Sequence, residues 1–377
     1  MTRTPPAVPT RSAHKTDQLF VNMGPQHPST HGVLRVGLTI EGEVIVKAEP
    51  DIGYLHRGTE KLLETRTYPQ GVVFSDRWDY CSAMTNNLAF SLAVERLMGV
   101  QAPPRADALR VIHCELQRIA SHLLFVGTYG IDIGAATPFL HTFREREMIL
   151  DLFEMSSGAR LTYNHIRIGG VAADITPEWA AKAREFLAYF KPRLCEYDTL
   201  LTYNPIFLDR TQGIGVISAE TALAWGLSGP NLRASGVPYD VRKWAPHCGY
   251  EGYPFEMALG KAGDCFDRYH CRVREMRESA KIVEAALEGL PEGEVMAKIP
   301  KLLKPAPGEA YAHVEGSRGD LGIYVVSDGT AMPYRLHVRA PSFANLAIVQ
   351  ELFVGQKLAD VIAMLGSLDI VLGEVDR

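Results

Sequence analysis

Hydrophobic and polar positions alternate in two parts of the chain. Between residues 33 and 48, hydrophobic side chains recur at every second position on both sides of Glu41-Gly42-Glu43. Alternation that is interrupted by a glycine turn predicts a β-hairpin. The same pattern returns over 309–340, where Asp328-Gly329 predicts a turn between strands. Small β layers are therefore predicted near both ends of the chain.

The hydrophobic positions between these parts follow a helical period. They recur three and four residues apart from residue 80 onward, most regularly over 105–125. Thr176 and Pro177 are residue types that favour a helix cap and a first helical position. The predicted helices cover 80–98, 105–125, 141–156, 177–201, 219–226, 264–290 and 356–366. These elements predict the α+β class, with a long-helix bundle as core and β layers from both terminal regions.

Four regions are expected along the chain. Residues 1–18 contain three prolines and no apolar core, which predicts a flexible arm rather than a secretory signal. An N-terminal β-rich region follows over 19–76, and the helical bundle core over 77–300. The C-terminal α/β region, 301–377, is expected to pack back on the core.

Composition narrows the class of protein. The 377 residues are 46% hydrophobic and 22% charged, which is typical of a globular protein. The net charge of −5 argues against a nucleic-acid partner, because phosphate neutralisation needs a basic surface. The longest apolar stretch, 123–140, contains Asp132 and three glycines, so it is not expected to span a membrane.

The cysteines and the common motifs exclude several kinds of site. None of the six cysteines forms a C-x-x-C pair, which argues against iron–sulfur or zinc ligation within this chain. Cys265 and Cys271 lie six apart on a predicted helix and point to different faces. Scattered, reduced thiols are typical of a cytosol-facing protein. The nucleotide, phosphate and hydrolase signatures are absent, and Gly213-Ile214-Gly215 lacks a third glycine.

A few residues could carry chemistry, and each has a second interpretation. His27 and His31 lie in a loop rich in proline and glycine, where they could bind a ligand or hydrogen-bond the loop itself. Asp132 could be a carboxylate with a tuned pKa, or a residue that turns a surface loop. Asp79 and Tyr80 are expected at the start of a helix, where Asp79 suits a cap and Tyr80 a core position. The residues alone leave these alternatives open.

Several long motifs resemble the 49-kDa-type polypeptide (the D subunit) of respiratory complex I. The resemblance runs from about residue 19 to the end of the chain. Its motifs are MGPQHPSTHG (23–32), IGYLHRGTEKLLE (52–64), RTYPQ (66–70), FREREMILDLFE (143–154), IRIGGV (166–171), LRASGVPYDVRK (232–243), VSDGTAMPYRLHVRAPSF (326–343) and SLDIVLGEVDR (367–377).

That family is similar to the large subunit of nickel–iron hydrogenases, which hold their metals with two pairs of cysteines. The first hydrogenase motif falls on residues 77–82, so that Asp79 and Ser82 stand where thiolates would be. The second falls on residues 369–377, with Val371 and Glu374 in place of cysteines. Because soft thiolates bind nickel and iron, the resemblance implies a hydrogenase-like fold that has lost its metal.

The resemblance implies that the vacated cavity binds the headgroup of a quinone. The family's quinone-binding tyrosine falls on Tyr80, its histidine on His31, and the aspartate paired with that histidine on Asp132. Pocket lining is expected from the remaining candidates: His27, Asp79, Ser82, Val371 and Glu374. This chain is expected to bind no cofactor of its own, the electrons coming from a [4Fe–4S] cluster in a partner subunit.

The resemblance also implies partners and a location. The expected partners are the small [4Fe–4S] subunit, the 30-kDa-type subunit and a membrane subunit through which the quinone enters. The expected location is the cytoplasmic face of a bacterial inner membrane, as a peripheral protein. An active hydrogenase and a non-catalytic scaffold are the alternatives, and the electron donor of the complex could be ferredoxin instead of NADH. The missing cysteine pairs argue against the first, and the presence of His31, Tyr80 and Asp132 together argues against the second.

Overall fold

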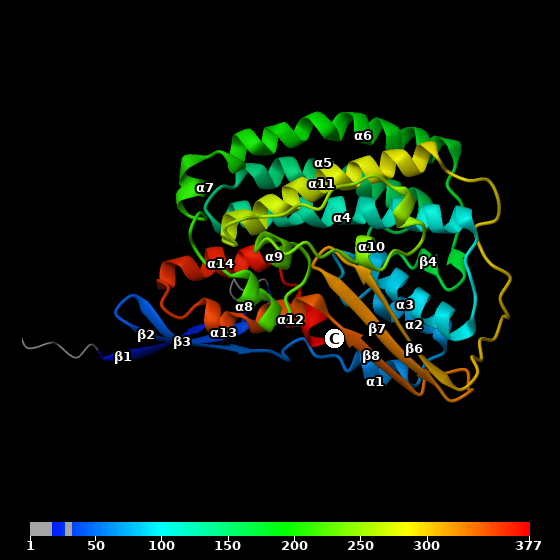
Figure 1. Ribbon diagram of the computed structural model, residues 1–377, viewed down its shortest axis with the longest axis horizontal. Coiled ribbons are helices and arrows are strands. Elements are labelled where there is room, and N and C mark those ends of the chain that lie inside the picture. Colours follow the sequence, from blue (N-terminus) through cyan, green and yellow to red (C-terminus); the bar gives the residue numbers. More distant parts are fainter. Residues whose placement is uncertain (1–16, 27–31) are drawn as a thin grey trace, which may run out of the picture.

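Four long helices form one layer of the structure, a computed structural model that describes residues 17–26 and 32–377. They are α4 (Pro104–Asp132), α5 (Thr137–Ser157), α6 (Pro177–Tyr197) and α11 (Cys265–Glu288) (Figure 1). α4 lies in the middle of the fold and is buried on almost every side, with α5 and α11 packed against it. α6 begins as its sequence predicts, because the Thr176 hydroxyl accepts a hydrogen bond from the Trp179 backbone.

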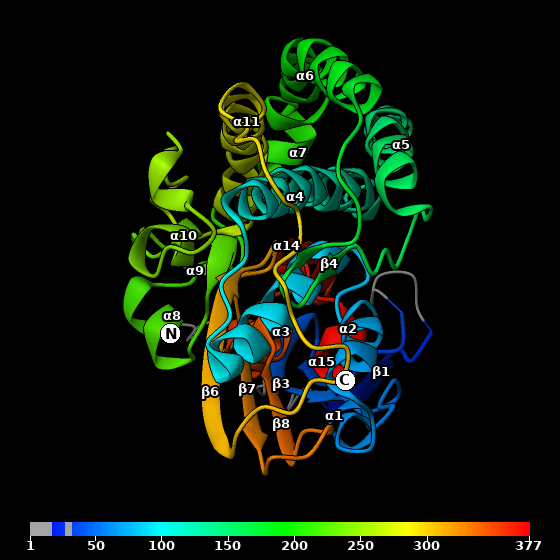
Figure 2. The same ribbon diagram turned by 90° about the vertical axis from the view of Figure 1, so that its right-hand side faces the viewer.

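Two small antiparallel sheets lie on the other side of α4 (Figure 2). The first has the order β1 (Gln18–Met23), β2 (Arg35–Glu41) and β3 (Val44–Asp51). The second has the order β6 (Gly308–Glu315), β7 (Asp320–Ser327) and β8 (Arg335–Arg339). Helix α3 (Ala83–Met98) packs on β6 and β7. A two-stranded ribbon, β4 (Ile166–Arg167) and β5 (Gly170–Val171), lies beside them.

Short helices connect these layers. They are α1 (Thr59–Leu63), α2 (Tyr68–Ser75), α7 (Pro205–Asp209), α8 (Ala219–Ala224), α9 (Gly229–Ala234), α10 (Val241–Trp244), α12 (Pro341–Ala347), α13 (Val349–Leu352), α14 (Val361–Leu368) and α15 (Leu372–Asp376). The last two, with the 3₁₀ turn Leu358–Asp360 before them, carry the chain back into the interior, where α12 packs against α15 and α14 against α4 and α11.

The predicted α+β class and both predicted strand regions are confirmed. Helix 105–125 is longer than predicted, because Gly127 and Gly130 do not interrupt it. A Cβ atom added at Gly127 would lie 2.5 Å from the Thr142 hydroxyl oxygen, so this glycine lets α5 approach α4 closely. The final helix starts at Val361 rather than 356, and α15 after it was not predicted.

Further boundaries differ from the prediction, among them the start of α5 at Thr137 rather than 141. Gln18 belongs to β1, while most of the predicted arm lies outside the described residues. The helix predicted from 177 to 201 ends at Tyr197 and continues as a π-helical turn, Asp198–Thr202. In the described part of the chain, no helix is long and apolar enough to cross a membrane.

Candidate functional site

The turn before α3 holds three of the predicted site residues, Asp79, Tyr80 and Ser82. It is a turn and not the helix start that was predicted, because α3 begins only at Ala83. The Asp79 carboxylate accepts a hydrogen bond from the Cys81 backbone nitrogen at 3.1 Å. The Asn86 side chain donates to the Asp79 carbonyl oxygen at 3.0 Å. These two bonds close the turn and hold Asp79 and Tyr80 ahead of the helix.

Helix α15 packs directly against this turn. A Cβ atom added at Gly373 would lie 2.6 Å from the Trp78 carbonyl oxygen and 3.1 Å from a ring carbon of Tyr80. The Arg57 guanidinium bridges the two segments, since it donates to the Arg77 carbonyl at 2.9 Å and to the Gly373 carbonyl at 2.7 Å. The two regions that resemble the hydrogenase cysteine motifs are therefore neighbours.

A buried guanidinium joins the same two regions from inside. Arg318 donates to Asp79 at 2.9 Å and to Asp369 at 3.2 Å, and it also donates to the Ser121 hydroxyl at 2.6 Å. Arg272 forms a second ion pair with Asp369 at 3.3 Å. We call Asp79, Ser121, Arg272, Arg318 and Asp369 the Arg318 cluster. All five residues are buried, and such charges are tolerated in an interior only when they are paired.

Tyr80 is the most exposed of the site residues that the structure describes. It exposes 37% of its surface, so the interpretation of Tyr80 as a core residue is wrong. Partial burial, together with the nearby Cys81 and Asp79, raises the pKa of its hydroxyl above the usual value. The hydroxyl therefore carries its proton at neutral pH, and it can donate a hydrogen bond to a ligand oxygen.

Ser82, Val371 and Glu374 lie around the Arg318 cluster. The Ser82 hydroxyl lies 2.9 Å from the hydroxyl of Ser317, the residue before Arg318. Ser342 accepts a hydrogen bond from the Val371 nitrogen at 3.3 Å, and its own backbone nitrogen donates to Glu374 at 3.0 Å. Burial raises the pKa of Glu374 to about 7, with a further contribution from the nearby Asp79 carboxylate. Glu374 can thus change its protonation state close to neutral pH.

His27 and His31 lie outside the described residues, but the residue after them can be placed. A Cβ atom added at Gly32 would lie 3.6 Å from the Leu372 side chain in α15. Asp132, the last residue of α4, is partly exposed, and its carboxylate lies against Gly366 in α14, where an added Cβ would be 2.9 Å away. The pairing of Asp132 with His31 stays a prediction.

Sequence reasoning missed the residues that hold the site together. Arg57, Arg272 and Arg318 were not predicted as site residues, and Asp369 was noted only as the start of a motif. Gly316-Ser317-Arg318-Gly319 between two strands has the composition of an exposed turn, yet Arg318 is buried. The described residues contain no group of three or more His, Cys, Asp or Glu that could hold a metal ion. Asp79, which aligns with a cysteine of the hydrogenase motif, accepts a hydrogen bond from the Arg318 guanidinium.

Comparisons with known proteins identify relatives of this chain. Residues 132–377 match the family described as "Respiratory-chain NADH dehydrogenase, 49 Kd subunit". The D subunit of NADH-quinone oxidoreductase from Desulforamulus reducens is 55% identical over 96% of this chain and 99% of its own length. The protein of the same name from Carboxydothermus hydrogenoformans is 51% identical over the same shares. A second D subunit of NADH-quinone oxidoreductase, from Chloroflexus aurantiacus, is 48% identical over 97% of this chain and 96% of its own.

Proposed function

The chain belongs to the family of the 49-kDa subunit of respiratory-chain NADH dehydrogenase, complex I, and we propose that it forms the pocket in which quinone is reduced. The pocket would be completed by a small subunit whose [4Fe–4S] cluster supplies the electrons. The observation that carries this proposal is the partly exposed Tyr80, held between α15 and the buried Arg318 cluster. A 30-kDa-type subunit and a membrane subunit would be further neighbours, at the cytoplasmic face of the membrane.

Tyr80 would bind one carbonyl oxygen of the quinone headgroup. Reduction of quinone to quinol takes two electrons and two protons, and negative charge develops on the carbonyl oxygens as electrons arrive. A hydroxyl that donates to such an oxygen stabilises the charge when it is already positioned before reaction. The turn that carries Tyr80 is fixed by Arg57, Gly373 and the Asp79–Arg318 ion pair, which supports this role.

His31 would be the second donor, with Asp132 as its partner. An imidazole has an ordinary pKa of about 6.5, so it can give and regain a proton near neutral pH. A carboxylate beside it would favour the imidazolium form and orient the ring. The positions of Gly32 beside α15 and of Asp132 beside α14 are compatible with this pairing. Loss of the His31 proton to quinol would leave Asp132 less neutralised, a change that could be coupled to proton pumping in the membrane subunits.

The test is NADH-driven quinone reduction in membranes that carry Tyr80→Phe. NADH–ferricyanide activity is measured in parallel because it bypasses the quinone site. Tyr203→Phe is the matched control, since Tyr203 exposes 68% of its surface and lies in a loop after the π-helical turn. We expect Tyr80→Phe to lose about tenfold or more of quinone reduction, the effect of removing one positioned donor, with ferricyanide activity intact. Normal quinone reduction in Tyr80→Phe would instead favour a scaffold role.

A further inference from the structure

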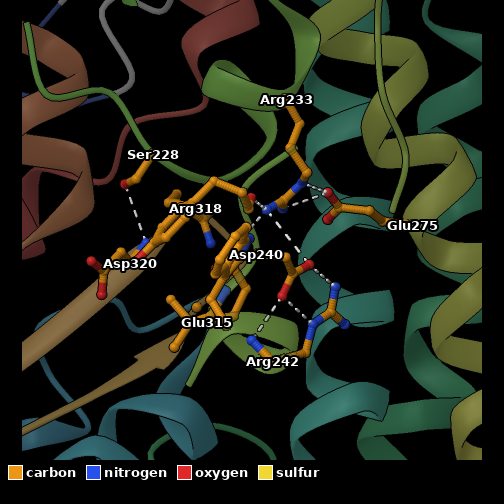
Figure 3. A network of polar contacts seen from close by, with 12 residues as sticks. Ser228, Arg233, Asp240, Arg242, Glu275, Glu315, Arg318 and Asp320 are labelled. Atoms are coloured by element: carbon orange, nitrogen blue, oxygen red, sulfur yellow. Dashed lines mark hydrogen bonds and ion pairs between the residues drawn. The ribbon is translucent and has the colours of Figure 1, made fainter. Parts of the chain in front are cut away.

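A second network of buried charges adjoins the Arg318 cluster (Figure 3). We call it the inner network. It contains four carboxylates, three guanidiniums and one imidazole, all buried: Glu115, Asp240, Glu275 and Glu315; Arg118, Arg233 and Arg242; and His122.

The guanidinium groups connect the carboxylates into one network. Arg233 donates to Glu275 and to Glu315, each at 2.7 Å. Arg242 donates to Asp240 at 2.7 Å and to Glu115 at 3.1 Å. Arg118 donates to Glu115 at 3.2 Å and to the Glu315 carbonyl oxygen at 2.6 Å. The backbone and side chain of Glu315 are therefore both held by arginines.

The inner network contains one carboxylate more than guanidinium groups. An unpaired carboxylate in a dry interior costs several kcal/mol, so such a group takes up a proton instead. His122 is fully buried, and its Nε2 lies 2.9 Å from Glu275. Burial lowers the pKa of this imidazole, and its Nδ1 has no hydrogen-bond partner within the described residues. The extra proton is therefore not expected on His122.

Hydrogen bonding singles out Glu315 among the four carboxylates. Glu115 accepts from two arginines, Tyr250 and Ser279, while Glu275 accepts from His122 and twice from Arg233. Asp240 is bound by Arg242 through two side-chain nitrogens and the backbone. Glu315 has only a single nitrogen of Arg233 and the Val241 backbone nitrogen among the described residues. Burial raises the pKa of Glu315, which agrees with this ranking.

Three segments each supply residues to both charge groups. α4 supplies Ser121 to the Arg318 cluster and His122 to the inner network. α11 supplies Arg272 to the Arg318 cluster and Glu275 to the inner network. Arg318 lies in the loop after β6, and Glu315, three residues earlier, ends that strand. Negative charge beside Tyr80, which lies within electrostatic range of Arg318, therefore acts on Glu315 through a low-dielectric interior.

We propose that the inner network is a buried proton-binding site, in which Glu315 holds one proton whose binding follows the charge of the quinone beside Tyr80. The inference rests on the proposed function. The step is proton binding alone: the ionised fraction of Glu315 takes H⁺ from the aqueous phase and becomes a carboxylic acid, while the electrons stay with the quinone. Negative charge at the headgroup favours uptake of the proton, and removal of that charge favours its release.

The charged and titratable groups that face Glu315 come from several elements. They are Arg118 of α4, Arg233 of α9, Tyr239 and Asp240 before α10 and Arg242 of α10. Glu115 of α4 and Glu275 of α11 bind the same arginines. The three arginines lower its proton affinity, whereas burial and Asp240 raise it. Because the pKa of Glu315 is raised in the folded chain, its protonated form is present at lower pH and is lost as pH rises.

The test compares Glu315→Gln with wild type in whole complexes in membranes. Quinone reduction is divided by ferricyanide activity and followed from about pH 6 to about pH 9. We expect the ratio to fall more steeply with rising pH in wild type than in Glu315→Gln, because only the wild-type carboxyl can lose a proton. Glu95→Gln is the matched control, because Glu95 is a buried carboxylate paired with Arg110 outside the inner network, and it should keep the wild-type profile. An identical pH dependence in wild type and Glu315→Gln overturns the proposal.

A second measurement applies if Glu315→Gln does not assemble. It uses complex that carries Glu374→Gln, so that the Glu374 carboxyl cannot contribute. Infrared difference spectra (reduced minus oxidised) of this complex should show a carboxylic C=O band that shifts in D₂O. Absence of the band overturns the proposal. Tyr80→Phe tests the proposed function separately. Normal quinone reduction in Tyr80→Phe, together with a weaker alkaline fall in Glu315→Gln, would reject Tyr80 as the headgroup ligand but keep Glu315 as a proton-binding group.

Discussion

The tight contact between α15 and the turn before α3 makes Gly373→Ala a sharp probe of the site. The new Cβ would lie 2.6 Å from the Trp78 carbonyl oxygen and 3.2 Å from the Arg77 carbonyl oxygen, both backbone atoms. Ordinary van der Waals contact is about 3.5 Å, so α15 and the turn must separate by about 0.9 Å. Tyr80 lies on that turn, with a ring carbon 3.1 Å from the same Cβ, and it must move with it.

The separation has two expected consequences of different size. Overpacking of a buried contact costs about 1–3 kcal/mol of stability, which the complex should survive. Displacement of a positioned group by about 1 Å can lower a rate about a hundredfold. We therefore expect quinone reduction to fall by about ten- to a hundredfold, while the amount of assembled complex falls little.

The assay is NADH–quinone against NADH–ferricyanide activity, with assembly followed on native gels. Gly252→Ala is the control, because Gly252 has no atom within 4 Å of an added Cβ and no positive φ angle. An exposed substitution of this kind changes stability by about 0.5 kcal/mol or less. Equal quinone activity in Gly373→Ala and Gly252→Ala would refute the idea that α15 positions Tyr80 for the reaction.

Two further predictions concern the charges of the site. Arg318→Met should destabilise the chain by about 3–5 kcal/mol, because it removes the cation that pairs with the buried Asp79 and Asp369. Thermal denaturation of the assembled complex measures this loss. Unchanged denaturation would show that the two aspartates do not need Arg318. The pKa of Glu374 is raised to about 7 in the folded chain, so its protonated form stabilises the folded state at low pH. This contribution to the free energy of unfolding is lost as pH rises from the ordinary carboxyl pKa of about 4.3 to about 7, by about 1.4 kcal/mol per pH unit. Glu374→Gln should remove that loss between about pH 5 and about pH 7, and denaturation midpoints that follow pH as in wild type would contradict the assignment.

The sequence predicts the fold where one signal decides it. Alternation is enough for β2 and β3, because each has one face on the core, and the helical period is enough for α4 and α11. Sequence-based prediction fails where tertiary packing decides, as at Gly127 and Gly130. These glycines resemble helix breaks, but they lie within α4 and allow α5 to pack closely against it. It fails again at α15, which has only five residues and is held by α12 and the turn before α3.

The site follows from sequence only in part. The motif spacing places Asp79, Ser82, Val371 and Glu374 at comparable positions in two motifs, and the structure brings both motifs together. The residues that connect them are arginines from other parts of the chain. An arginine in sequence is normally a surface residue, and nothing local to Arg318 shows that two buried carboxylates will surround it.

The Arg318 cluster explains how the two motifs stay joined without thiolates between them. In the hydrogenase-like arrangement a bound metal connects the two cysteine pairs, whereas here Asp79 from the first region and Asp369 from the second meet one guanidinium. A guanidinium keeps its charge at every accessible pH and takes no electrons. It can therefore hold the segments in place, but it cannot take part in the charge changes of quinone reduction. If quinone is reduced beside Tyr80 as proposed, those changes fall on groups that exchange protons, and the buried carboxyl of Glu374 and the inner network around Glu315 both adjoin Arg318.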